Sequence, residues 1–175
     1  MSTPRMPGLA GGAAALWLFS ACSASDDPPV TPEPAPVEVA VELGTGEAEF
    51  EPIEGEPTLE MAAGFQGGFH VWLSVLGSGF EDERLDMKFV TALDGVLDSD
   101  LTMRATQKGR QVTNAEGEVF WTFAGYPGQV KDARCAHGKR VRLQVTLSDP
   151  VGREATDERF CIVALDEQYR SEDCE

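Results

Sequence analysis

Apolar and polar residues alternate along most of this chain in short segments. The clearest segment is residues 69–75, where Phe69, Val71, Leu73 and Val75 alternate with His70, Trp72 and Ser74. A period of two is typical of a β-strand with one buried face. Similar runs recur between residues 37 and 164, and glycine-containing turns such as Asp94-Gly95 separate them. No long segment has helical spacing, so the pattern predicts an all-β, antiparallel β-sandwich of about eight strands.

The last hairpin carries the most specific fold signal. Val141, Leu143, Val145 and Leu147 form one apolar face, which we expect to lie opposite Phe160, Ile162 and Ala164. Residues 149–152, with the sequence DPVG, supply the turn. A turn centred near Val151 places Cys161 opposite Arg140. The hairpin resembles the terminal hairpin of immunoglobulin-like bacterial modules, which implies an immunoglobulin-like sandwich.

Residues 1–21 have the layout of a secretory signal peptide. Arg5 precedes an apolar run from Leu9 to Phe19 that is too short to span a bilayer. The following sequence, Leu18-Phe19-Ser20-Ala21-Cys22, resembles the lipobox of bacterial lipoproteins. That resemblance implies cleavage before Cys22 and acylation of its thiol, including palmitate. The alternative is an ordinary secretory cleavage near Ala21 that leaves Cys22 as a free thiol.

The resemblance to lipoproteins also implies a location in the cell envelope. Ser23, rather than Asp, follows the cysteine, which favours the outer membrane of a Gram-negative bacterium. Residues 22–36 are rich in proline and acidic residues and contain no aromatic residue, so we expect a tether between lipid and domain. The β-sandwich domain is expected over residues 37–167, and an acidic C-terminal tail over residues 168–175.

The charge of the chain limits its partners. Its formal net charge is −16, and loss of Arg5 with the signal peptide makes the mature chain one charge more negative. This charge argues against nucleic acid and against a basic patch that docks on anionic lipid. It is compatible with divalent cations or a basic partner, although solubility is the simplest explanation.

One stretch combines a glycine turn with the best predicted strand. Residues 64–72 read GFQGGFHVW, and the chain resembles a group of predicted lipoproteins, common in myxobacteria, that carry a G-x-Q-G-G-x-H-V-W stretch. That resemblance implies fold and location only. A ligand that reaches the backbone at Gly67 and Gly68 would also meet His70 and Trp72 on one strand face. Alternatively, His70 bonds to a neighbouring loop and Trp72 covers the outer side of the sheet.

Two weaker patterns raise the possibility of a metal site. Cys135 and His137 are two residues apart and would form a site with His70 as a third ligand, unless Cys135 is in a disulfide. Asp94, Asp98 and Asp100 would supply oxygen ligands for Ca²⁺. The spacing of these aspartates lacks the glycine and terminal glutamate of an EF-hand loop, and solvated loop ends are the simpler interpretation.

Three cysteines remain when Cys22 is set aside, which allows one disulfide and one leftover thiol. The expected hairpin register brings Cys161 near the loop that holds Cys135. We therefore predict a Cys135–Cys161 disulfide and a Cys174 that is free or available for an intermolecular bond, with the other two pairings left open.

No catalytic motif is present. The sequence contains two histidines, no Gly-x-Ser-x-Gly and no phosphate-binding loop. We therefore expect a lipid-anchored, non-catalytic binding or structural module without a cofactor, whose partner is another envelope protein. The alternative is a periplasmic metal- or small-ligand-binding protein that uses His70, Cys135 and His137.

Overall fold

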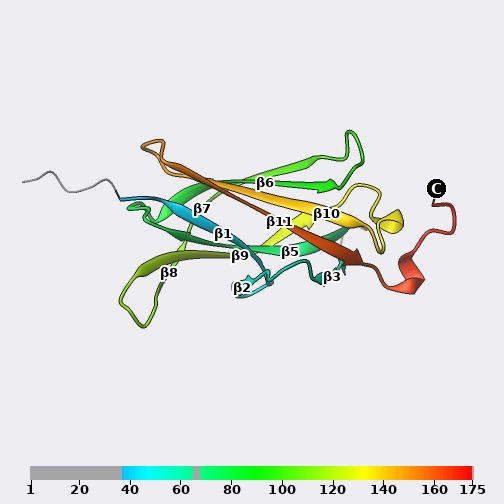
Figure 1. Ribbon diagram of the computed structural model, residues 1–175, viewed down its shortest axis with the longest axis horizontal. Coiled ribbons are helices and arrows are strands. Elements are labelled where there is room, and N and C mark those ends of the chain that lie inside the picture. Colours follow the sequence, from blue (N-terminus) through cyan, green and yellow to red (C-terminus); the bar gives the residue numbers. More distant parts are fainter. Residues whose placement is uncertain (1–36, 65–67, 175) are drawn as a thin grey trace, which may run out of the picture. The chain divides into compact units, whose positions relative to one another are not determined.

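The computed structural model describes residues 37–64 and 68–174, so the predicted signal peptide, Cys22, the tether and Gly67 lie outside the described residues. The described part is a β-sandwich of two sheets (Figure 1). The first sheet contains β1 (Ala40–Thr45), β2 (Glu51–Pro52), β4 (Ala62–Ala63), β5 (Phe69–Ser78), β8 (Arg110–Thr113) and β9 (Val119–Gln129). The second contains β3 (Thr58–Glu60), β6 (Arg84–Leu93), β7 (Leu101–Lys108), β10 (Arg140–Ser148) and β11 (Glu154–Ala164). Two short 3-10 helices, η1 (Ala133–Cys135) and η2 (Glu167–Tyr169), complete the elements of the described residues.

The strand order defines the edge strands of each sheet. The first sheet runs β2-β1-β5-β9-β8, with β4 beside β5, and the second runs β3-β11-β10-β6-β7. All pairs are antiparallel except β3 with β11.

The eleven strands of the described residues exceed the predicted eight, and four of them, β2, β3, β4 and β8, have at most four residues each.

The core lies between the two sheets and follows the predicted alternation. Leu43, Val71, Leu73 and Val75 of the first sheet are buried, as the pattern predicts. The second sheet contributes side chains that are at most 2% exposed, namely Leu85, Met87, Phe89, Val141, Leu143, Val145 and Leu147. Burial of these apolar faces is the main stabilising term of the fold.

The last strand has the opposite face buried from the one predicted. Cys161 and Val163 point into the core, whereas Phe160, Ile162 and Ala164 are only half-buried. Cys161 pairs with Val141, and Arg140 pairs with Ile162, so the predicted register was wrong by one residue. A shift of one residue exchanges the two faces of a strand. The guanidinium of Arg140 covers the ring of Phe160, 3.8 Å from its centroid, which stabilises the ring on the outer face.

Between β7 and β8 the chain crosses from the second sheet to the first at Gly109. Gly109 follows β7 directly and precedes β8, and its N–H donates to the carbonyl of Glu83 over 2.7 Å. A Cβ at this position would lie 2.8 Å from the ring of Phe123 and 3.1 Å from Cβ of Trp121. The crossing therefore needs a residue without a side chain.

Candidate functional site

His70 and Trp72 share the outer face of the first sheet, as predicted. Phe69 and Val71 of the same strand point into the core, so the alternation of β5 sends the two neighbours outward. The His70 and Trp72 rings contact each other edge to face, with centroids 4.4 Å apart. Of the predicted ligand-facing side chains, His70 and Trp72 are therefore in direct contact.

The imidazole of His70 is buried although it lies on an outer face. It is 8% exposed, and Nε2 has no hydrogen-bond partner in the part of the chain that the structure describes. Burial lowers the pKa of His70, and the negative charge of Glu47 opposes that shift more weakly. The ring is therefore neutral at pH 7.

Gly68, the described glycine at the end of the glycine turn, lies at the surface. It is exposed, and a Cβ there would meet no described atom within 4 Å. Its carbonyl accepts a 2.8 Å hydrogen bond from the N–H of Gly64. The open space around Gly68 argues against a steric requirement for glycine at this position.

The disulfide joins Cys135 to Cys174, with a Cα–Cα distance of 5.3 Å. The predicted Cys135–Cys161 pair was wrong because Cys161 faces the core, is fully buried and has a free thiol. Cys135 lies in η1, outside the sheets, and meets the C-terminal residues there. The one-residue error in register, which turned Cys161 outward, accounts for the wrong pairing.

Residues 166–174 are held against the domain by more than this bond. Arg170 donates from Nε to the carbonyl of Leu165 over 2.8 Å, and the N–H of Ser171 donates to the carbonyl of Arg134 over 3.2 Å. The ring of Tyr169 packs on Phe69, with centroids 5.2 Å apart. Sequence reasoning missed these contacts, although Tyr169 is an aromatic residue in an otherwise polar segment and was a usable signal.

The proposed His70, Cys135 and His137 ligand set is not available. The disulfide removes the thiolate of Cys135, and Nδ1 of His137 accepts a 3.1 Å hydrogen bond from the N–H of Leu165. Within residues 37–64 and 68–174, no group of three or more His, Cys, Asp or Glu side chains is arranged to hold a metal ion.

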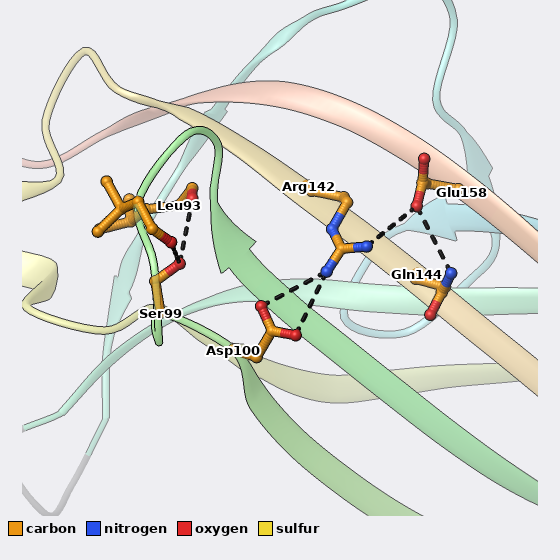
Figure 2. Close-up of polar contacts among 7 residues, drawn as sticks. Leu93, Ser99, Asp100, Arg142, Gln144 and Glu158 are labelled. Atoms are coloured by element: carbon orange, nitrogen blue, oxygen red, sulfur yellow. Dashed lines mark hydrogen bonds and ion pairs between the residues drawn. The ribbon is translucent and has the colours of Figure 1, made fainter.

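Two of the three aspartates in the candidate calcium loop form ion pairs with arginines. Asp94 forms a 2.6 Å ion pair with Arg140, and Asp100 lies 3.4 Å from Arg142. Figure 2 shows Arg142 between Asp100 and Glu158, which ties the start of β7 to β10 and β11. Ser99 is fully buried and donates to the carbonyls of Leu93 and Val96. These contacts make the loop a structural connection between β6 and β7.

Comparisons with known proteins assign the chain to no family. No protein-family profile matches the chain, and no curated protein is significantly similar to it. Among the described residues, no helix is long and apolar enough to cross a membrane.

Proposed function

We propose that this protein is a lipid-anchored lipoprotein of the cell envelope that binds another envelope protein and catalyses no reaction. The observation that carries the proposal is the lipobox-like sequence that ends at Cys22, followed by a tether rich in proline and acidic residues. Acyl chains contribute about 0.8 kcal/mol for each buried methylene, and more than one chain is needed for a stable anchor. The outer membrane of a Gram-negative bacterium is the proposed location.

The Cys135–Cys174 disulfide supports export, because structural disulfides persist in oxidising compartments. The non-catalytic part of the proposal rests on how the domain uses several of its polar side chains. Asp149 accepts hydrogen bonds from Val151 and Arg153 in the last turn. Asp157 binds the backbone of β1, and His137 binds the backbone at Leu165. These groups stabilise turns and strand edges.

Metabolic labelling with a palmitate analogue tests the anchor. The wild-type chain is expected to be labelled, and Cys22→Ala is expected to abolish labelling. Cys161→Ala is the matched control, since it removes a different cysteine and should leave labelling unchanged. Labelling of the Cys22→Ala variant would overturn the lipoprotein assignment.

Crosslinking in intact cells tests the binding role. Tagged full-length protein is expected to crosslink to one dominant envelope protein, and separation of the two membranes should recover both in the outer-membrane fraction. Recovery of the protein without any crosslinked partner contradicts the binding role. Recovery in the soluble fraction contradicts the location.

A further inference from the structure

Strand β7 is a free edge whose backbone is available for pairing. It is the last strand of its sheet, after β6. The Gly109 to Glu83 hydrogen bond continues the β6–β7 register, in which Leu85 faces Gln107 and Phe89 faces Met103. Alternate residues of an antiparallel strand direct their N–H and C=O groups to the same neighbour. The odd-numbered residues of β7 therefore bond to β6, and Thr102, Arg104 and Thr106 direct their backbone groups away from it.

These outward backbone groups have no partner in residues 37–64 or 68–174, since no hydrogen bond there outside the strand ladders involves them. The facing edge of the other sheet is different. Strand β8 pairs with β9 only from Val119 to Thr122. Beyond that point, Pro127 has no N–H to donate, and the carbonyl of Gln129 accepts a hydrogen bond from the hydroxyl of Thr91. Of these two facing edges, β7 is therefore the one whose outward backbone groups are free among the described residues.

A groove separates these two edges. It has a volume of about 360 Å³, and apolar side chains of β6 and β7 form one wall, namely Phe89, Leu101 and Met103. Pro127 and Gly128 of β9 form the other wall. A strand added beside β7 would place every second side chain in this groove, because side chains alternate between the two faces of a sheet.

The outer face beside the groove carries two neighbouring cations. Lys88 of β6 lies directly opposite Arg104 of β7, and neither forms an ion pair with any described residue. The nearby carboxylate of Asp86 accepts from the hydroxyl of Thr106. Like charges in directly opposite positions destabilise a sheet. In so acidic a chain, this local excess of positive charge favours an acidic side chain on an added strand.

We infer that the free edge of β7 binds an extended segment of the envelope partner, in which apolar residues alternate with acidic ones. The segment adds to the sheet as a new strand, its apolar side chains enter the groove, and a carboxylate pairs with Arg104. This mode of recognition takes affinity from the backbone and specificity from alternate side chains. The inference rests on the proposed function, since it names the surface by which the domain binds its partner.

Fluorescence anisotropy with two short synthetic peptides tests the inference on full-length protein in detergent. One peptide alternates valine with glutamate, and the other alternates valine with lysine. The glutamate peptide is expected to bind, and the lysine peptide to bind at least several-fold more weakly. Arg104→Glu should weaken binding of the glutamate peptide about three- to tenfold, because it replaces an attractive cross-strand pair with a repulsive one.

Proline at position 102 separates backbone pairing from side-chain contact. Thr102→Pro removes an N–H that points away from β6, so the β6–β7 ladder keeps its hydrogen bonds and peptide binding should be lost. Thr102→Val keeps the N–H and should bind like the wild type. Hydrogen exchange should show slower exchange at Thr102, Arg104 and Thr106 when the glutamate peptide is added. Equal binding by the Pro and Val variants, with both folded by circular dichroism, overturns the inference.

Two further outcomes separate this inference from the proposed function. If the wild type and Thr102→Pro crosslink to the same envelope protein in cells, the binding role stands and the β7 site is wrong. If the wild type binds the peptide but crosslinks to nothing, the site stands and the binding role fails. Protection of the β7 amides that grows with protein concentration, without peptide, would assign the edge to a second copy and overturn the inference.

Discussion

The carboxylate of Asp157 accepts a hydrogen bond from the backbone N–H of Leu43, with an Oδ2–N distance of 2.8 Å. Asp157 has the same orientation in β11 as the buried Cys161, so its side chain points inward across the gap between the sheets. Arg159 donates to the same oxygen from Nε over 2.8 Å. An inward-pointing charge is one way in which a protein protects a strand edge. Here the carboxylate of Asp157 covers the edge of β1 at Leu43.

Asp157→Ala should therefore cost about 1 to 3 kcal/mol in the free energy of unfolding, because it leaves a partly buried N–H without its acceptor. Glu154→Ala is the matched control, since Glu154 is an exposed acid in the same strand. Urea unfolding monitored by tryptophan fluorescence measures both. Equal destabilisation by the two variants would mean that the contact with Leu43 contributes nothing.

The disulfide should contribute to stability through the length of chain it closes. Cys135 and Cys174 are 39 residues apart, and a loop of that length corresponds to about 4 kcal/mol in the chain-entropy account. Cys135→Ser and Cys174→Ser should lower the melting temperature equally, and the double variant should lower it no further. Peptide mapping without reduction checks the pairing directly, and recovery of Cys161 in a disulfide would contradict it.

The free thiol of Cys161 should be inert while the protein is folded. Burial raises its pKa to about 12, and the charge of Glu56 adds to that shift. An unfolded cysteine titrates near 9.0, so the thiol adds stability below that pH, and this stability is lost as the pH rises from 9.0 towards about 12. A thiol-specific reagent at pH 8 should react only after urea is added. Fast reaction with the native protein, absent in Cys161→Ala, would show that the thiol is exposed.

The sandwich was predictable because alternation is a local property. Leu73 and Val75 point into the core, and their neighbours point outward, as the order of apolar residues alone indicates. The last strand was not predictable in the same way. Phe160 and Cys161 are both apolar, and the outward position of the ring depends on Arg140, twenty residues away in sequence. Hydropathy does not report such a cation–π contact, and the disulfide prediction failed with it.

The candidate site was predictable only in part, for a similar reason. The shared face of His70 and Trp72 follows from the period of β5. The burial of His70 and the role of the C-terminal residues depend on contacts between segments that are distant in sequence. The groove beside β7 depends on Gly109, where the strand changes sheets and leaves half of β9 without a neighbour in β8. A single glycine does not indicate such a crossing.

Substitution by alanine should destabilise the domain at Gly109 and have little effect at Gly68. Gly109→Ala places a Cβ 2.8 Å from the ring of Phe123, which is itself buried, so it should cost about 1 to 3 kcal/mol in the free energy of unfolding. Gly68→Ala meets open space among the described residues, so its effect should stay within about 0.5 kcal/mol. Thermal unfolding of both variants checks the prediction. A large loss at Gly68 would show that the turn needs glycine there.

His70 should make the domain sensitive to mild acid. Burial lowers the pKa of His70 below the usual 6.5, so the unfolded chain takes up a proton at a higher pH than the folded one. The stability that depends on the neutral ring is therefore complete above pH 6.5 and is lost as the pH falls through the lower pKa of the folded state. His70→Leu removes this dependence and a buried Nε2 that lacks a partner among the described residues. The variant should be at least as stable as the wild type at pH 5, which urea unfolding at pH 5 and pH 8 measures. A wild-type protein that loses no more stability than His70→Leu between pH 8 and pH 5 would show that the ring takes up its proton without cost in the folded state.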